Sequence, residues 1–174
     1  MDTTKTALVL GATGGIGGEM LRQLLAAGWT VRALKRGELQ AARSDGIEWL
    51  RGDALMRADV MAAARGCSVI VHAVNPPGYR NWGQLVLPML DNTIAAAIAG
   101  NATIVLPGTV YNFGPDVFPT AGNVLAEDAP QRPLTRKGAI RVELEARLQR
   151  ASTQGAKVII VRAGDFFGPR AGNN

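Results

Sequence analysis

The chain has 174 residues, of which 47% are hydrophobic and 19% charged, a balance that predicts one globular domain and excludes a disordered protein. One cysteine, Cys67, excludes a disulfide framework, and one histidine, His72, excludes a metal cluster built from His and Cys. The net charge of +5 contains no run of five like charges and aromatic residues make up only 5%, which favours a solvated basic surface over a nucleic-acid-binding one.

Six short apolar runs, rich in Val, Ile and Leu, recur along the chain and are predicted to form strands. Most of them are continuously apolar rather than alternating, as expected for strands that helices cover on both faces of a sheet. The runs lie at residues 6–10, 30–34, 47–50, 69–73, 103–106 and 157–161.

Stretches with helical character separate these runs, at residues 16–27, 60–64, 84–99 and 136–151. Alternation of strand and helix predicts an α/β fold with a doubly wound parallel sheet and right-handed crossovers. The irregular stretch 108–134 is rich in Pro, Gly, Asn and Asp and is long for a compact domain. We therefore expect it to form an active-site or lid loop.

The strongest motif is GATGGIGG at 11–18, where glycine recurs as G-x-x-G-x-x-G directly after the first predicted strand. A chain that turns sharply, admits a phosphate to its backbone and starts a helix close to the sheet leaves no room for a Cβ at these points. The free N–H groups and the positive dipole at the helix start favour a diphosphate. In this turn the predicted cofactor-binding residues are Gly11, Thr13, Gly14, Gly15, Ile16 and Gly17.

The second predicted strand ends at Lys35 and Arg36, where a site that binds the ribose hydroxyls of NAD usually places Asp or Glu. A guanidinium can pair with a 2′-phosphate, so Arg36 predicts NADP over NAD; the alternative is that Arg36 is simply exposed. Asp53, after the third strand, could accept a hydrogen bond from the adenine amino group or could cap the next helix. The predicted cofactor site also includes Ala54, Ala73, Val74 and Asn75.

Together these pieces resemble the short-chain dehydrogenase/reductase superfamily, in particular its extended branch, the NAD(P)-dependent epimerase/dehydratase family. The resemblance covers nearly the whole chain and includes GATGGIGG at 11–18, RGD at 51–53, VIVHAVNPP at 69–77, LPGTVYNFGP at 106–115, KGAIRVELEARL at 137–148 and VRAGDFFGP at 161–169. It implies a Rossmann sheet with strand order 3-2-1-4-5-6 and one NAD(P)-binding domain over residues 1–174.

The resemblance also implies a longer chain, since members of this family usually run to about twice the length of this domain. We therefore expect the chain to be a fragment or a shortened version, with the part that closes over the substrate largely absent. A substrate-side surface left exposed in this way favours self-association, so a dimer or larger homo-oligomer is predicted.

The resemblance also implies a Tyr-x-x-x-Lys pair on the helix after the long loop, in which the Tyr is the acid/base and the Lys lowers its pKa and holds the nicotinamide ribose. No tyrosine of this chain has that spacing. Counting back from Glu145, which matches a glutamate typical of that helix, places Lys137 at the Tyr position and Arg141 at the Lys position. Lys137 could act as a general acid/base if burial and neighbouring cations depress its pKa, although an exposed basic residue is an equally open interpretation.

The family's partner Ser or Thr has two candidate positions. Thr109 lies near its expected place after the fifth strand, but aligning Val110 and Tyr111 with the family's Val-Tyr-Gly places Pro107 there instead. The predicted catalytic residues are Thr109, Lys137 and Arg141.

These observations predict an NADP-binding oxidoreductase or epimerase that acts on a carbonyl compound or a sugar-nucleotide-like small molecule, with NAD as the alternative cofactor. The missing Tyr-x-x-x-Lys leaves a second hypothesis open, a catalytically silent NADP-binding redox sensor or interaction module. No signal peptide or apolar segment of 18 residues is found, so a cytoplasmic location without a membrane partner is expected.

Overall fold

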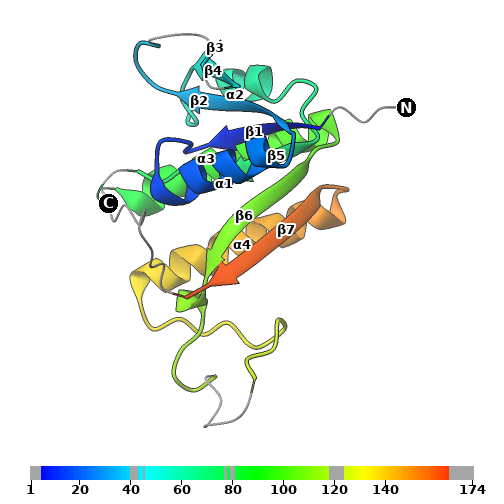
Figure 1. Cartoon of the computed structure of the whole chain (residues 1–174). Coiled ribbons are helices and arrows are strands. Elements are labelled where there is room, and N and C mark those ends of the chain that lie inside the picture. Colours follow the sequence, from blue (N-terminus) through cyan, green and yellow to red (C-terminus); the bar gives the residue numbers. More distant parts are fainter. Residues whose placement is uncertain are drawn as a thin grey trace.

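The strands of the protein form a single sheet. The computed structural model describes residues 5–39, 43–44, 46–76, 78, 81–117 and 124–164. The strands in these ranges are β1 (Thr6–Leu10), β2 (Thr30–Lys35), β3 (Arg43–Ser44), β4 (Ile47–Arg51), β5 (Val69–His72), β6 (Thr103–Thr109) and β7 (Lys157–Ala163). They pair in the order β3-β4-β2-β1-β5-β6-β7 (Figure 1).

The parallel strands confirm the predicted Rossmann order. All neighbours in the sheet are parallel except β3 and β4. Counted along the chain without β3, the strands follow the order 3-2-1-4-5-6. The sequence did not predict β3, because a two-residue strand is too short to carry a periodic pattern. Strands β6 and β7 run further than the apolar runs indicated, since they stay paired as far as Thr109 and Ala163.

Helices lie on both faces of this sheet, as a doubly wound fold requires. They are α1 (Gly15–Ala26), α2 (Arg57–Ala63), α3 (Trp82–Gly100) and α4 (Arg136–Thr153), and the short 3-10 helix η2 (Val110–Asn112) follows β6. Leu21 of α1 shares a buried cluster with Val9 of β1. Leu90 of α3 and Leu144 of α4 belong to the cluster on the other face, which includes Ile104 of β6.

The central strand β1 shows why two layers of helices are needed. Leu8 and Leu10 belong to the cluster beneath α2, α3 and α4, whereas Val9 belongs to the cluster beneath α1, and none of the three is more than 1% exposed. A strand that is apolar on both faces is stable only where both are covered. The core therefore lies along the middle of the sheet, and the turns after the strands remain for binding.

After β6 the chain enters the irregular stretch that the sequence analysis predicted as a long loop. In its described parts, Arg132 forms an ion pair with Asp116 at 3.2 Å, and Arg162 of β7 donates to the backbone carbonyl of Glu127 at 2.8 Å. These contacts fasten the loop to itself and to the sheet. The end of the VRAGDFFGP motif, from residue 165 on, lies outside the described residues.

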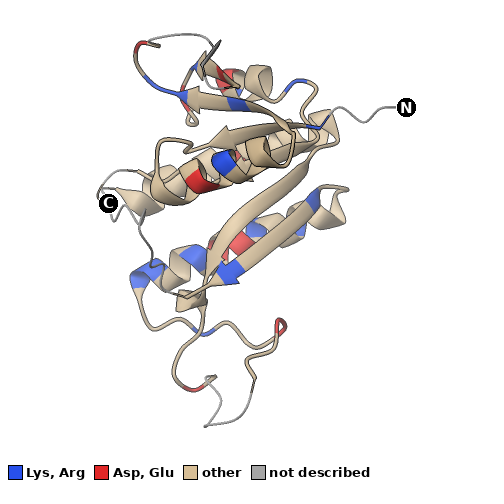
Figure 2. Cartoon of the chain, in the orientation of Figure 1, with Lys and Arg blue, Asp and Glu red and all other residues tan. Residues whose placement is uncertain are grey.

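Acidic and basic residues both occur along α1 and α4 (Figure 2). On α1 Arg22 pairs with Glu19, and on α4 Glu143 pairs with both Arg147 and Arg150. Among the described helices, none combines the length and the apolar composition that crossing a bilayer demands. The described His, Cys, Asp and Glu residues form no group that could hold a metal ion.

Candidate functional site

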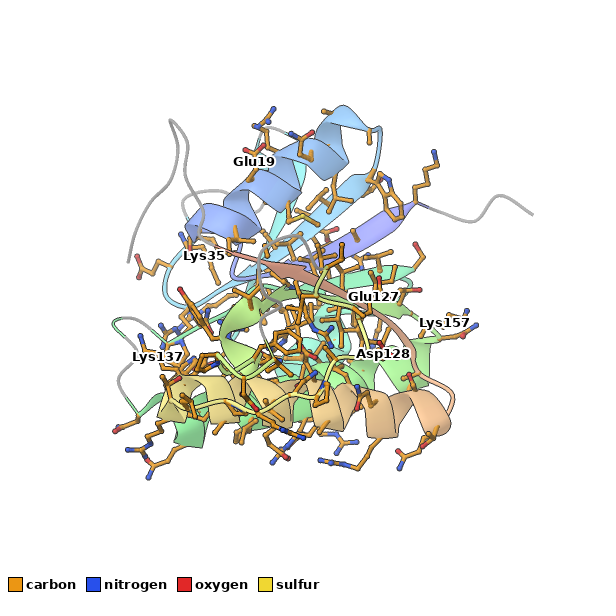
Figure 3. All side chains as sticks on the ribbon, turned by 90° about the horizontal axis from the view of Figure 1, so that it is seen from below. Glu19, Lys35, Glu127, Asp128, Lys137 and Lys157 are labelled. Carbon is orange, nitrogen blue, oxygen red and sulfur yellow. The ribbon has the colours of Figure 1, made fainter. Side chains whose placement is uncertain are left out.

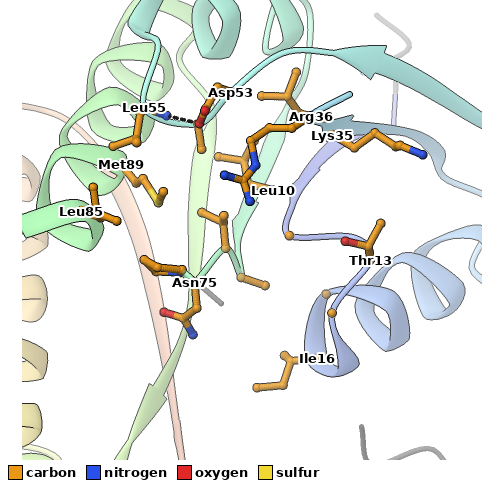
Figure 4. A pocket seen from close by; sticks show the side chains of 18 of the residues that line it. Leu10, Thr13, Ile16, Lys35, Arg36, Asp53, Leu55, Asn75, Leu85 and Met89 are labelled. Carbon is orange, nitrogen blue, oxygen red and sulfur yellow. Dashed lines mark hydrogen bonds between the residues drawn. The ribbon is translucent and has the colours of Figure 1, made fainter. Parts of the chain in front are cut away.

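A cavity of about 500 Å³ lies at the carboxyl ends of β1, β2, β4 and β5. This is the edge of a parallel sheet at which ligands of open α/β folds bind. Every predicted cofactor-binding residue lines it (Figure 4), namely Gly11, Thr13, Gly14, Gly15, Ile16, Gly17, Arg36, Asp53, Ala54, Ala73, Val74 and Asn75. The structure therefore brings together residues that are far apart in the sequence.

Two glycines of the turn are required by packing. Gly11 has a φ of +85°, and a Cβ on it would lie 2.5 Å from the carbonyl oxygen of Ala73. A Cβ on Gly17 would lie 2.1 Å from the carbonyl oxygen of Gly11. Both distances are far below contact, so these positions bring α1 close to β1 and β5.

Gly14, the middle glycine of the turn, has room for a Cβ. A Cβ on Gly14 would be 3.4 Å from the carbonyl oxygen of Gly11, an ordinary contact, and its φ of −87° suits any residue. No side chain caps α1 at Gly14, and its first turn contains no acidic residue. The first residues of α1 line the cavity, and their N–H groups have no carboxylate from the first turn of their own helix beside them, an arrangement that suits an anion.

Two basic residues at the end of β2 line the cavity. Arg36 is exposed, and Figure 4 shows its guanidinium directed into the cavity, whereas Lys35 points away from it. The Nζ atom of Lys35 lies 5.8 Å from the centre of the Trp49 ring. Lys35 was not predicted as a binding residue, although its place beside Arg36 at a strand end was a usable signal.

The turn after β4 is held by hydrogen bonds from both sides. The Oδ1 atom of Asp53 accepts from the backbone N–H of Leu55 at 2.9 Å, and the Asp53 N–H donates to Asp59 at 2.9 Å. The side chain of Asn92 on α3 donates to the carbonyl of Ala54 at 2.9 Å. The N-cap of α2 is Met56, so Asp53 supports the turn before the helix rather than capping the helix itself.

Helix α3 supplies cavity residues that the sequence analysis did not find. Leu85 and Met89 come from its first two turns, and Leu10, Leu34 and Leu55 add further apolar surface. Apolar residues in a buried helix have the same sequence pattern whether they face the core or a ligand, so no sequence signal separated them.

A chain of contacts leads from the cavity to α4. The indole N–H of Trp82 donates to the Oδ1 atom of Asn75 at 3.1 Å. The guanidinium of Arg141 lies 5.0 Å from the centre of the Trp82 ring, a cation–π distance. Arg141 itself does not line the cavity, but Trp82 connects it to a residue that does.

None of the three predicted catalytic residues lines the cavity. Thr109 accepts a hydrogen bond from the Tyr111 N–H at 3.3 Å, and Lys137 is exposed in the first turn of α4. A Cβ on Gly138 would be 2.3 Å from the carbonyl oxygen of Tyr111, so η2 packs directly on that turn. Figure 3 shows Lys137 and Lys35 toward the same edge of the molecule, away from Lys157 at the start of β7.

His72 is buried at the end of β5, with 3% of its surface exposed. Its Nδ1 lies 2.8 Å from the Thr93 hydroxyl, which itself donates to the carbonyl of Met89 at 3.2 Å. The ring therefore donates from Nδ1, and its Nε2 has no hydrogen-bond partner among the described residues. Burial, with a smaller contribution from the positive charge of Arg141, lowers the pKa of His72 to about 4.

This shift makes stability depend on pH. Between pH 4 and 6.5 the unfolded chain binds a proton at His72 that the folded protein does not, so the free energy of unfolding falls as the pH drops through this range. At 1.36 kcal/mol per pKa unit the loss is about 3 kcal/mol. Urea unfolding at several pH values checks this, with His72→Gln as the variant that has no ring to titrate. An equally steep pH dependence in the variant would contradict the assignment.

A buried polar network connects α4, which contains Lys137 and Arg141, to its neighbours. Glu145 is 2% exposed and binds the guanidinium of Arg162, with a shortest distance of 2.8 Å. Gln131 donates to the same carboxylate at 2.7 Å and accepts from the Asn112 amide at 3.1 Å. The hydrogen bond and charge of Glu145 raise the pKa of Arg162. The network joins α4, β7, η2 and the long loop into one unit.

The comparisons with known proteins agree with this geometry. A family model described as NAD(P)H-binding matches residues 11–164. A 2-alkyl-3-oxoalkanoate reductase of Shewanella oneidensis is 29% identical over 113 residues, which cover 64% of this chain and 29% of the reductase.

Solved structures of similar fold are longer than this chain. The Bordetella bronchiseptica enzyme WbmH in complex with NAD+ has a TM-score of 0.76 at 20% identity, with 98% of this chain and 60% of that chain covered. The Thermus thermophilus UDP-glucose 4-epimerase in complex with NAD has a TM-score of 0.77 at 23% identity, with 95% and 57% covered. The sequence resemblance is therefore confirmed for the fold, and the chain spans well under two thirds of these structures.

Proposed function

The chain belongs to the NAD(P)H-binding family, and on this basis we propose that it binds NADP as the cofactor domain of an oxidoreductase or epimerase. The substrate in this proposal is a carbonyl compound or a sugar-nucleotide-like small molecule. The main support is the glycine turn, where a Cβ on Gly11 or Gly17 would collide with backbone and the first residues of α1 line the cavity. Such a cradle fits the diphosphate of a dinucleotide.

Each part of the cavity has a proposed task. The N–H groups at the start of α1 would hold the diphosphate, and Arg36 would pair with the 2′-phosphate on the adenosine side. Asp53 would accept from the adenine amino group with a carboxylate that the turn already fixes in place. The bound cofactor supplies the hydride chemistry, and the protein supplies its position and surroundings.

Thr109, Lys137 and Arg141 remain the proposed catalytic group. Their support is that η2, which follows Thr109, packs on the first turn of α4, which contains Lys137, and that Arg141 contacts Trp82, the hydrogen-bond partner of the cavity residue Asn75. In this proposal Lys137 delivers or accepts the proton at the reacting carbon's oxygen, and Arg141 adds positive charge nearby. Residues 1–174 would act as one domain within a cytoplasmic enzyme.

The choice of NADP over NAD can be tested at Arg36. We expect Arg36→Ala to weaken NADP binding by about tenfold to a hundredfold, because a charge-assisted pair with the phosphate is lost. Binding of NAD, which has no 2′-phosphate, should change by less than about threefold. Calorimetric titration of both ligands measures this difference.

Arg57 offers a matched control, since it is exposed at the start of α2 and does not line the cavity. Arg57→Ala should leave both affinities unchanged. Tighter binding of NAD than of NADP by the unaltered protein would reject the preference, and binding of neither would reject the proposed function.

A second function has its own support. None of the three proposed catalytic residues lines the cavity, and the sequence has no Tyr-x-x-x-Lys pair. Both observations favour a catalytically silent module that senses the redox state of NADP. Such a module requires different affinities for the oxidised and reduced cofactor, because a ligand shifts a conformation only through differential binding. Equal affinities together with NADPH-dependent reduction of a carbonyl substrate would favour the enzyme.

We also propose self-association. Ile159 and Val161 of β7 are 51% and 55% exposed, and β7 has a sheet partner on one side among the described strands. Exposed apolar side chains on an edge strand favour contact with another protein surface. Light scattering of the purified chain would give its oligomeric state.

A further inference from the structure

Trp82, the first residue of α3, determines how the amide of Asn75 is oriented. The Trp82 side chain is buried, at 5% exposure, and its N–H donates to the Asn75 Oδ1 atom at 3.1 Å. An indole N–H can only donate, so it pairs with an amide oxygen and is repelled by an amide N–H. The Asn75 oxygen therefore faces Trp82, and the Asn75 NH₂ group is left to face elsewhere.

Asn75 lies at the part of the cavity opposite to the adenosine side. Strand order places β5, which Asn75 follows, on one side of β1, and places β2 and β4, which Arg36 and Asp53 follow, on the other side. A dinucleotide whose diphosphate rests on α1 and whose adenosine lies over β2 and β4 extends its other half over β5. Figure 4 agrees, since Asn75 approaches the cavity from a different side than Arg36.

We propose that Trp82 is a positioning residue, which fixes the Asn75 amide so that its N–H donors face the nicotinamide half of the bound cofactor. This rests on the proposed cofactor function of the same cavity. The donors of Asn75 then select an acceptor oxygen on that half, either of the carboxamide or of the ribose. Without the indole N–H, the amide turns between two orientations, and one of them presents its oxygen to the ligand's oxygen.

The ring of Trp82 also contacts Arg141, and a test variant has to preserve this contact. The ring lies 5.0 Å from the guanidinium of Arg141 and belongs to the buried cluster that includes Ile104 of β6 and Leu144 of α4. Trp82→Phe removes the N–H and keeps an aromatic ring for this contact. It therefore isolates the hydrogen bond to Asn75, whereas a change to a small residue would also disturb packing.

The test compares two ligands in calorimetric titrations of the full chain. One is NADP, and the other is adenosine 2′,5′-bisphosphate, which has the adenosine side without the nicotinamide half. We expect Trp82→Phe to weaken NADP binding by about tenfold, because the Asn75 amide no longer holds its uncharged hydrogen bond to the nicotinamide half. Binding of the bisphosphate, which lacks that half, should change by less than twofold. Equal weakening of both ligands would mean a general structural role and would overturn the inference.

Asn75→Asp provides the matched variant. The carboxylate still accepts from the Trp82 N–H but has no N–H to offer, so NADP binding should weaken by at least the same factor with Trp82 intact. In an Asn75→Asp background, Trp82→Phe should have little further effect, since both changes remove one interaction. Independent, multiplying effects would overturn the inference. Failure of the unaltered protein to bind either ligand would instead overturn the proposed function, and with it this role of Trp82.

Discussion

Replacing Gly17 by alanine is expected to destabilise the protein strongly, because the new Cβ would lie 2.1 Å from the carbonyl oxygen of Gly11. The atoms that this Cβ would meet belong to the backbone of Gly11 and Ala12, so no neighbouring side chain can move aside, and α1 has to shift from the sheet. Overpacking of this kind costs about 3 kcal/mol, at the upper end of the usual range. For a chain of this size the melting temperature should fall by about 6–12 °C.

Gly14→Ala should instead leave the stability nearly unchanged and weaken NADP binding. Its Cβ would make an ordinary contact at 3.4 Å with the Gly11 oxygen, and its φ of −87° suits alanine, so the melting temperature should stay within about 2 °C. The methyl group would instead occupy space where a diphosphate approaches the amides of α1. NADP binding should therefore weaken by at least about tenfold, or 1.4 kcal/mol.

Thermal melts and calorimetric titrations of the two variants together separate folding from binding. The glycine cradle would be misassigned if Gly14→Ala bound NADP as tightly as the unaltered protein. It would also be misassigned if Gly17→Ala melted at an unchanged temperature.

Replacing Glu145 by alanine should have the second large effect, on stability. The change leaves the Arg162 guanidinium, 20% exposed in its side chain, without the carboxylate that pairs with it, and it leaves the Gln131 amide without its acceptor. Removing one partner of a buried ion pair costs about 3–5 kcal/mol, and the partial exposure of Arg162 places this site near the lower value. Urea unfolding measures the loss.

Glu143, two positions earlier on α4, is the natural control. The Glu143 side chain is 40% exposed, against 2% for Glu145, so its pairs with Arg147 and Arg150 are solvated and Glu143→Ala should cost less than about 1 kcal/mol. Replacing both members of the buried pair, as Glu145→Leu with Arg162→Met, should restore much of the lost stability. Similar losses for Glu145→Ala and Glu143→Ala would show that burial does not strengthen the pair.

Much of the fold could be predicted because its signals are local. Continuous apolar runs and the helical stretches between them indicated the parallel strands, and their alternation indicated the doubly wound sheet. The wall of the cavity was predicted for a related reason. Parallel strands end at one edge, so the residues after β1, β2, β4 and β5 had to meet, and Gly11, Arg36, Asp53 and Asn75 do so.

The rest depends on packing between distant segments. Nothing in the sequence indicated that the Trp82 N–H would donate to Asn75 or that the Trp82 ring would contact Arg141. The three residues come from a turn and two different helices. The two-residue strand β3 was too short to detect. Counting back from Glu145 along α4 placed Lys137 and Arg141 at the Tyr and Lys positions of the Tyr-x-x-x-Lys pair. Such counting does not indicate which residues line a cavity.

The bare start of α1 has a consequence for competition. An acidic side chain tethered near those amides would be present at an effective concentration of roughly millimolar or more, and every anionic ligand would first have to displace it. This helix has no acidic residue in its first turn and no side-chain cap at Gly14. No carboxylate from the first turn of α1 therefore competes for these amides. An anion that binds from solution does not first have to displace one.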